Sequence, residues 1–387
     1  MSMHILHICS GYPVHKLYKE LAEKLDQPGL KQTIYVPVRS IKQIGVNQVF
    51  NHDRIQIIYS FILRPYHRLF YRQKIRTIVK DISEQVKLGE IDLIHAHFLF
   101  SDGGVARELQ KEHHIPYITA VRNTDINYFY KYKPYLMQYG ADILKNSENV
   151  IFITPNYRDK LINKYLTQSD GKLVRRKSYI IPNGIPNHWI DNPPPEYKYR
   201  SDPPRILYVG QFSPNKNVEL LIKACDDLSK SMKLSLTLVG SGGQMENRIK
   251  RMVKSGRYPF VTLMGRVDDE NELRRIYNDH TMFAMISHGE TFGLVYIEAL
   301  SQGLPVIYTK GEGIDGYFIE EEIGRAVDPT DIEDVKSAIL QVHNLVESLS
   351  PNLHMKTLRF KWDHISKQYY QIYSRIIDTV RHGLTTD

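Results

Sequence analysis

Two carboxylates and a glycine lie close together in residues 287–298, at a spacing that could serve a bound phosphate and a bound sugar. Glu290 stands in a polar loop, Gly293 follows it, and Glu298 comes about one turn into the helical pattern that begins at Leu294. A helix start offers unpaired N–H groups and a partial positive charge, which suit phosphate. Glu298 could point back toward a ligand bound there. The alternative interpretation is a turn glycine followed by a helix with a solvated glutamate.

The residues around this loop predict the elements that hold it. Residues 281–286 form an apolar run with the length of a buried strand, residues 294–302 follow a helical period, and residues 305–308 predict another strand. Strand, loop, helix and strand in this order form the repeating unit of a parallel sheet. The loop therefore lies at the carboxyl end of a strand and leads into a helix start.

This block resembles the E-x-F-G-x-x-x-x-E signature of the retaining glycosyltransferases of family 4, and Glu290, Phe292, Gly293 and Glu298 match it. The resemblance implies that Glu290 faces a donor sugar and takes part in catalysis. It also implies that the backbone of Phe292, Gly293 and Leu294 approaches the sugar and diphosphate. Glu298 would then hold the ribose hydroxyls.

Other turns in the second half of the chain resemble the same family. Its V-G-R-x-x-x-x-K pattern places an arginine and a lysine on the diphosphate, where this chain has Gln211 and Lys216. The resemblance makes Lys216 a catalytic phosphate ligand and leaves one cation missing at Gln211; a solvated lysine at a helix start is the alternative. It also places Gly240 near the nucleotide, and Arg266 with Val267 in the loop that contacts the base.

Two sites in the first half resemble the family's acceptor domain. A turn after the first strand carries Gly11, where many relatives have two adjacent glycines, and the resemblance places its backbone beside the sugar-nucleotide. A plain turn is the alternative. Residues 92–97 are similar to the family's D-x-x-H-x-H strand end, which implies that His97 points toward a cleft between domains. Packed strand histidines are the alternative there.

Residues 121–125 depart from the family pattern. Relatives often carry His-Gly-x-Asp, whose histidine contacts the donor sugar; here Asp125 matches, whereas Arg122 replaces the histidine and Asn123 the glycine. The leaving phosphate can accept the acceptor's proton in this class, so loss of the histidine need not abolish the reaction. We expect Arg122 and Asp125 to be catalytic and Asn123 to lie on the sugar side. Arg122 could instead bind an anionic donor sugar or acceptor through a carboxylate or phosphate.

Strands alternate with helical patterns through most of the chain, which predicts doubly wound α/β domains. The predicted strands cover residues 3–9, 33–38, 55–59, 91–97, 116–121, 150–154, 205–210, 234–239, 260–265, 281–286 and 305–308. The resemblance implies the GT-B fold, with two Rossmann-like domains facing across a cleft. We expect an acceptor-binding domain over residues 1–182, a proline-rich linker over 183–204, a donor-binding domain over 205–356, and a helix over 357–381 that crosses back to the first domain.

The composition limits the class of protein. A chain of 387 residues with 42% hydrophobic residues suits two globular domains, and no apolar run reaches the ~18–20 residues of a spanning helix. The first residues predict a strand rather than a signal peptide, so we expect a cytoplasmic protein. Cys9 and Cys225 are far apart, which predicts neither a disulfide nor a metal site. The charge is +11 over residues 1–185 and −3 over the remainder.

Much of the positive charge of the first half falls in residues 61–80, which contain six basic residues interleaved with aromatic and aliphatic ones and no acid. At a helical period, such a segment can lie on an anionic membrane surface, where each basic residue contributes on the order of 1 kcal/mol. A surface helix with a solvated basic face is the alternative. We expect no nucleic-acid partner, because no recognised binding module accompanies the segment.

Together these features favour a retaining, metal-independent glycosyltransferase that uses a nucleotide-sugar, a UDP-sugar first of all, and no cofactor. Its acceptor would be a glycan or lipid-linked molecule, in bacterial surface polysaccharide synthesis at the inner face of the cell membrane. A catalytically silent nucleotide-sugar-binding subunit and a GT-B-type nucleotide-sugar epimerase remain alternatives. A nicotinamide dehydrogenase is disfavoured, because Met245 stands where the third glycine of its fingerprint belongs.

Overall fold

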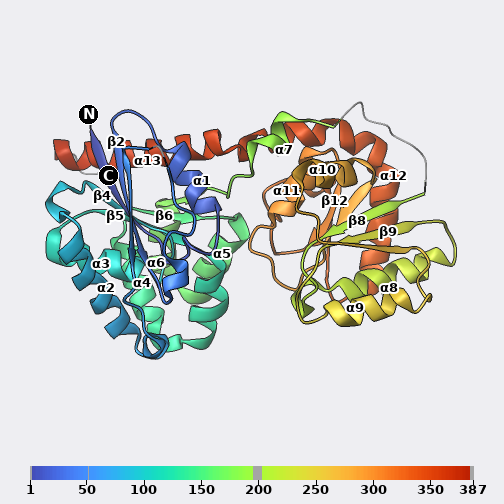
Figure 1. Ribbon diagram of the computed structural model, residues 1–387, viewed down its shortest axis with the longest axis horizontal. Coiled ribbons are helices and arrows are strands. Elements are labelled where there is room, and N and C mark those ends of the chain that lie inside the picture. The colour runs from blue at the N-terminus through green and yellow to red at the C-terminus, as the bar shows by residue number, and fades with distance from the viewer. Residues whose placement is uncertain (1, 51, 195–202, 384–387) are drawn as a thin grey trace. The chain divides into compact units, whose positions relative to one another are not determined.

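The computed structural model describes residues 2–50, 52–194 and 203–383, and the chain forms two compact units, each described here by itself (Figure 1). Unit 1 consists of Met1–Ile153, Tyr157–Gly184 and Trp362–Asp387, and unit 2 of Thr154–Asn156 and Ile185–Lys361. The chain thus changes unit inside the predicted linker, directly after Gly184. The rest of that linker belongs to unit 2, except residues 195–202, which lie outside the described residues.

Unit 1 is built on a parallel sheet of seven strands in the order β3-β2-β1-β4-β5-β6-β7. These strands are β1 Met3–Ile8, β2 Leu30–Pro37, β3 Ile55–Ser60, β4 Leu93–Ala96, β5 Tyr117–Val121, β6 Asn149–Phe152 and β7 Ser178–Ile180. Six of them were predicted, whereas the three-residue β7 was not. The strand order reverses between β1 and β4, and in doubly wound sheets ligands bind outside the carboxyl ends of the strands at that point.

Helices cover both faces of this sheet because alternate strand residues are apolar on each face. Leu6 and Ile8 belong to a core formed with the helices of one face, whereas Met3 and Ile5 belong to a core formed with α1 and α13. The helices of unit 1 are α1 Leu17–Lys24, α2 Tyr71–Gln85, α3 Gly103–His113, α4 Met137–Asn146, α5 Pro155–Tyr165, α6 Gln168–Arg176 and α13 Trp362–His382.

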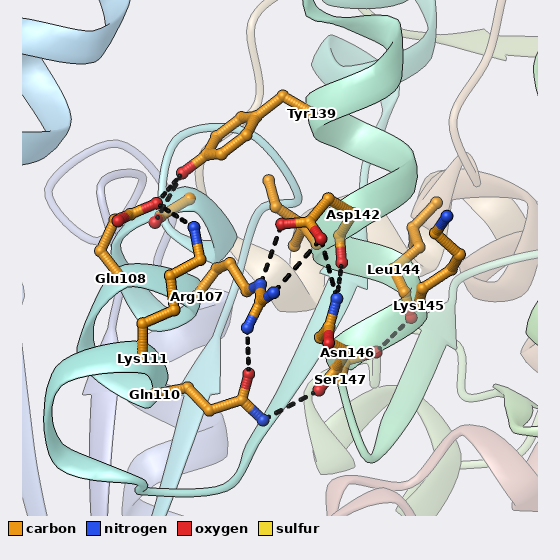
Figure 2. A network of polar contacts seen from close by, with 12 residues as sticks. Arg107, Glu108, Gln110, Lys111, Tyr139, Asp142, Leu144, Lys145, Asn146 and Ser147 are labelled. Atoms are coloured by element: carbon orange, nitrogen blue, oxygen red, sulfur yellow. Dashed lines mark hydrogen bonds and ion pairs between the residues drawn. The ribbon is translucent and has the colours of Figure 1, made fainter.

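A polar network ties α3 to α4 on the outside of this layer (Figure 2). The Arg107 guanidinium donates to both carboxylate oxygens of Asp142, at 2.9 and 3.2 Å, and to Gln110, which in turn donates to the Asn146 carbonyl. The positive charge of Arg107 lowers the pKa of Asp142 against the opposing effect of burial. The bidentate pair fixes the two helices in one register.

The C-terminal helix returns to the first domain, as predicted. Its apolar residues recur at three- and four-residue spacing, and Ile365, Tyr369 and Tyr373 pack in the core that contains Met3 and Ile5. The helix begins at Trp362 rather than at the predicted residue 357, because α12 continues through Thr357 and a short 3₁₀ turn separates the two helices.

Unit 2 is built on a second parallel sheet, in the order β10-β9-β8-β11-β12-β13. Its strands are β8 Arg205–Val209, β9 Ser235–Val239, β10 Val261–Gly265, β11 Met282–Ala284, β12 Val306–Thr309 and β13 Gly324–Val327. Its helices are α7 Asn187–Asp191, α8 Val218–Ser229, α9 Glu246–Lys254, α10 Glu270–Asn278, α11 Leu294–Ser301 and α12 Ile332–Thr357. β13 was not predicted, and β11 is shorter than the apolar run 281–286.

The basic segment 61–80 does not form the single surface helix that its period suggested. After β3 it continues as a loop and the 3₁₀ turn Pro65–Arg68, and α2 begins only at Tyr71. The apolar face of α2, including Ile75 and Ile78, is buried in the core of unit 1, and Lys74 is buried with it. The apolar face of this helix is therefore not available to a membrane.

Candidate functional site

The predicted donor loop runs from the end of β11 to the start of α11 in unit 2. Gly293 has a φ of +76°, and a Cβ on it would come within 2.5 Å of the Tyr296 ring and 3.2 Å of Glu290 Cγ. Any side chain at this position is therefore strained. The Tyr296 hydroxyl donates to the Met285 carbonyl at 2.5 Å, which fixes the other end of the loop. The glycine lets the backbone turn sharply in front of the helix start.

Lys216 and Glu290 meet at the carboxyl edge of the second sheet. Lys216 ends the 3₁₀ turn Pro214–Lys216 after β8, Glu290 lies in the loop after β11, and these two strands are neighbours. The Lys216 Nζ lies 2.5 Å from Glu290 Oε2, and the side chains are 23% and 14% exposed. The structure thus joins the predicted phosphate ligand to the predicted sugar ligand.

Residues that sequence reasoning missed hold this pair in place. The Asn215 amide donates to the Gly289 carbonyl at 2.8 Å, which joins the two loops. The Glu290 N–H donates to the Glu312 carboxylate at 3.2 Å, and the Gly313 N–H donates to the Glu290 carbonyl at 2.8 Å. Glycines on both sides of Glu312 were the sequence signal for a tight turn at that point. In the structure both glycines have positive φ.

Glu298 lies on α11 and is partly exposed, and the Tyr277 hydroxyl donates to its Oε2 at 3.3 Å. Burial of this carboxylate raises its pKa to about 7, against the opposing effect of the hydrogen bond from Tyr277. A carboxylate with one neutral donor still has lone pairs free to accept hydrogen bonds from the hydroxyls of a ligand.

The other donor-side predictions fall on neighbouring turns of unit 2. Gln211 is exposed, and Phe292 is buried below the donor loop, before Leu294 opens α11. Gly240 lies against the Gly210 backbone and leaves no room for a Cβ. After β10, exposed Arg266 pairs with Asp268 at 2.6 Å, beside Val267. Ligand contacts by these residues remain predictions.

Asp125 in unit 1 is fully buried, and its carboxylate is occupied by backbone groups. It accepts hydrogen bonds from the N–H groups of Leu99, Phe100 and Arg122 at 2.8 to 3.1 Å, and burial raises its pKa to about 6. In this geometry Asp125 holds two loops together, and the catalytic role remains a prediction. The neighbouring Asn123 accepts from the Asn127 amide.

His97 is buried in a group of three histidines rather than presented at a surface. β1 pairs with β4 so that His7 lies opposite His95, and His97 follows on the same face. The His97 ring stacks 3.9 Å from that of His95, and its Nε2 lies 3.1 Å from His7 Nδ1. Their possible ligand atoms lie within 4.8 Å of one another, a grouping that spacing in the sequence did not show. The absence of a metal site remains a prediction. His97 hydrogen-bonds to His7, and His95 hydrogen-bonds to the Tyr373 hydroxyl at 2.7 Å, so these histidines are packed in the core of the unit.

Gly11 is required by packing in unit 1. A Cβ on it would come within 2.7 Å of the Phe98 ring and 3.2 Å of Tyr18. The close approach that the sequence assigned to a ligand is made here by aromatic side chains, and a backbone contact to the donor remains a prediction.

Comparison with protein families decides the class. The profile described as Glycosyltransferase Family 4 matches residues 14–188, and the profile described as Glycosyl transferases group 1 matches residues 191–350. The chain belongs to the group 1 glycosyltransferases. The second match contains Glu298 and the contacting pair Lys216 and Glu290, so the predicted donor-side residues of unit 2 lie within the matched region.

Relatives of this glycosyltransferase match along most of its length. An uncharacterised glycosyltransferase of Methanocaldococcus jannaschii is 25% identical over 300 residues, 74% of this chain and 76% of the relative. A putative teichuronic acid biosynthesis glycosyltransferase of Bacillus subtilis is 23% identical over 349 residues, 82% of this chain and 83% of the relative.

Solved structures share the GT-B fold of this glycosyltransferase. Sucrose-phosphate synthase from Thermosynechococcus elongatus superposes with a TM-score of 0.76 at 22% identity, over 97% of this chain and all of that one. Anabaena HepE in complex with UDP-glucose superposes with a TM-score of 0.66 at 16% identity, over 96% of this chain and all of that one. In the described parts of this glycosyltransferase, no helix has the length and hydrophobicity needed to cross a membrane.

Proposed function

We propose that this glycosyltransferase transfers a sugar from a nucleotide-sugar, first of all a UDP-sugar, to a glycan or lipid-linked acceptor, with retention of the anomeric configuration. The observation that carries the proposal is the contact between Lys216 and Glu290 beside the start of α11. The solved complex of HepE with UDP-glucose and the name of the B. subtilis relative support a UDP-sugar and a surface polysaccharide, respectively.

The chemistry assigned to these groups is electrostatic. The Lys216 ammonium and the free N–H groups at the start of α11 would stabilise the charge of the departing diphosphate. Lys216 is held by Glu290 before the donor binds, so the phosphate would share a cation that is already in position. Glu290 would orient the sugar, and Glu298 would accept from the ribose hydroxyls. In this proposal, the lysine and the helix start supply the positive charge that a metal ion supplies in other transferases.

The proposal is tested by Lys216→Ala, with Lys223→Ala on the exposed face of α8 as the matched control. We expect Lys216→Ala to lower turnover by about 10²–10³-fold, the usual effect of removing one group that stabilises a developing charge, while the control keeps wild-type turnover. The measurement is release of UDP from a panel of UDP-sugars with glycan and lipid-linked acceptors. Binding without turnover would favour the silent subunit, and an isomerised donor without acceptor would favour an epimerase.

We also propose that unit 1 docks on an anionic membrane surface through the tip between β3 and α2. Leu69 and Phe70 are 75% and 59% exposed there, next to Arg68. The Lys133 ammonium donates to the Arg68 carbonyl at 2.8 Å and lies 5.7 Å from the Tyr128 ring. Exposed aromatic and aliphatic side chains beside cations suit the boundary between lipid headgroups and acyl chains.

Sedimentation with vesicles tests this docking. We expect the wild type to pellet with phosphatidylglycerol-containing vesicles at low salt, and pelleting to fall with salt because charge drives the approach. The variant Leu69→Ser with Phe70→Ser should stay in the supernatant, whereas Val380→Ser, which removes an exposed apolar side chain on α13, should pellet like the wild type. Equal binding to neutral phosphatidylcholine vesicles, or no binding at low salt, would contradict the proposal.

A further inference from the structure

Arg122 is a buried cation without an ion-pair partner. Its side chain is only 6% exposed, and no carboxylate lies within 4 Å of its side-chain nitrogens among the residues that the structure describes. Its Nε donates to the His97 carbonyl at 3.3 Å, and its Nη1 donates to Asn183 Oδ1 at 3.2 Å. Both acceptors are neutral. They fix the plane of the guanidinium without compensating its charge.

Of the remaining neighbours of Arg122, only Asp125, with a pKa of about 6, carries a negative charge at neutral pH, and its carboxylate forms no ion pair with the guanidinium. Tyr18, Tyr369 and Cys9 surround the guanidinium, and burial raises the pKa of each, so all three stay protonated. The acid nearest in the sequence is Asp125, whose carboxylate is occupied by three backbone N–H groups, one of them that of Arg122 itself. Burial disfavours the charged form, but the groups around Arg122, Asp125 among them, outweigh it and raise the pKa of Arg122. The guanidinium therefore stays charged although no described carboxylate pairs with it directly.

The position of Arg122 is one where α/β domains bind ligands. It follows β5 at the carboxyl edge of the sheet, with the loop after β1 on one side and Asn183, after β7, on the other. His15 in the loop after β1 is exposed, and its ring lies 6.3 Å from that of Tyr18, over which the Arg122 guanidinium lies at 5.9 Å. Burial, and the charge of Arg122 as the smaller cause, lower the pKa of His15. Exposed His15 and half-buried Asn183 are therefore solvent-accessible polar groups in the neighbourhood of the buried guanidinium.

We propose that Arg122, with Asn183 and His15, forms a subsite in unit 1 for an anionic group of the substrate, a carboxylate or phosphate. The inference rests on the proposed function and names its substrate class: the donor sugar or the acceptor carries a negative charge. A guanidinium held in a fixed plane recognises a planar or tetrahedral oxyanion through paired N–H groups. The anion would form an ion pair with the guanidinium. A charged substrate would therefore bind more tightly than its neutral analogue.

Two pairs of ligands separate the possible sources of the anion. For the donor, UDP-glucuronate is compared with UDP-glucose; for the acceptor, glucose 6-phosphate is compared with glucose in the presence of UDP. Calorimetric titration of the full-length protein gives each affinity. We expect the charged member of one pair to bind at least about tenfold more tightly than its neutral partner, which corresponds to ~1.4 kcal/mol.

The variants assign that preference to the guanidinium. Arg122→Gln should abolish it while UDP alone binds as in the wild type, and Arg176→Gln, at an exposed arginine of α6, should keep it. Arg122→Lys retains the positive charge without the paired N–H groups of the guanidinium, so it should keep part of the preference. It replaces Arg122→Gln in the test if that variant does not fold. An undiminished preference in both Arg122 variants, or no preference in the wild type, would overturn the inference. UDP binding in that case would leave the proposed function standing.

Discussion

We expect Glu298→Gln to bind UDP about 10- to 100-fold more weakly than the wild type, and its ligand-free form to be more stable. The loss of affinity follows because a hydrogen bond to a charged group contributes ~1.5–3 kcal/mol and the neutral amide would no longer attract the ribose hydroxyls in the same way. The gain in stability follows because burial raises the pKa of Glu298 to about 7, which means that the folded protein pays for keeping this carboxylate ionised. Titration with UDP and thermal unfolding measure the two effects.

The same substitution has a defined pH dependence. The folded pKa of about 7 lies above the ordinary 4.5 of an unfolded glutamate, so the unfolded chain loses this proton first as the pH rises. Glu298 therefore destabilises the wild type progressively between pH 4.5 and 7, and the stability gap to Glu298→Gln widens over that range and then stays constant. We expect the UDP affinity of the wild type to fall as the pH drops below 7, and that of Glu298→Gln not to follow this titration.

Glu347→Gln controls for the loss of one negative charge, because Glu347 is an exposed acid on α12 of the same unit. It should bind UDP like the wild type at every pH. Equal UDP affinity of Glu298→Gln and the wild type at pH 8 would show that Glu298 does not hold the ribose.

The donor loop could be predicted because its parts follow one another in the chain. The φ of +76° at Gly293, the helix that starts at Leu294 and the acid at Glu298 all express a local pattern of one strand-to-helix turn. The contact between Lys216 and Glu290 required only that β8 and β11 be neighbours, which the fold implied by the family resemblance supplies.

Contacts that depend on strand order or packing could not be predicted from local sequence patterns. His7 is far from His95 and His97 in the sequence, and it lies against them only because β1 pairs with β4. Residues 61–80 have a helical period, which led to the prediction of an exposed surface helix. In the structure the apolar face of α2 packs in the core of unit 1, and Lys74 is buried with it. Periodicity shows which side chains share a face and does not show whether that face is covered.

We expect acidification to unfold this protein steeply, because its three buried histidines are neutral in the folded state. Burial lowers the pKa of His7 to about 3 and those of His95 and His97 well below 6.5. Since the folded values lie below that of the unfolded chain, the unfolded chain binds more protons below pH 6.5. Their stabilising contribution is complete above pH 6.5 and is lost progressively as the pH falls below it, toward about 3 for His7. Each histidine contributes a slope of up to ~1.4 kcal/mol per pH unit to the free energy of unfolding.

All three together give up to ~4 kcal/mol per pH unit, which is large against a typical free energy of unfolding of ~5–15 kcal/mol. Urea unfolding at several pH values between 4 and 7 measures the slope. Carboxylates also titrate toward the lower end of this range, so the comparison of variants isolates the histidines. His97→Phe keeps a ring in the stack and should reduce the slope by ~1 kcal/mol per pH unit, whereas His364→Gln at an exposed position of α13 should leave it unchanged. A slope in His97→Phe equal to that of the wild type would mean that the buried rings accept protons without unfolding. The group would then be a proton-binding site rather than packed polar core.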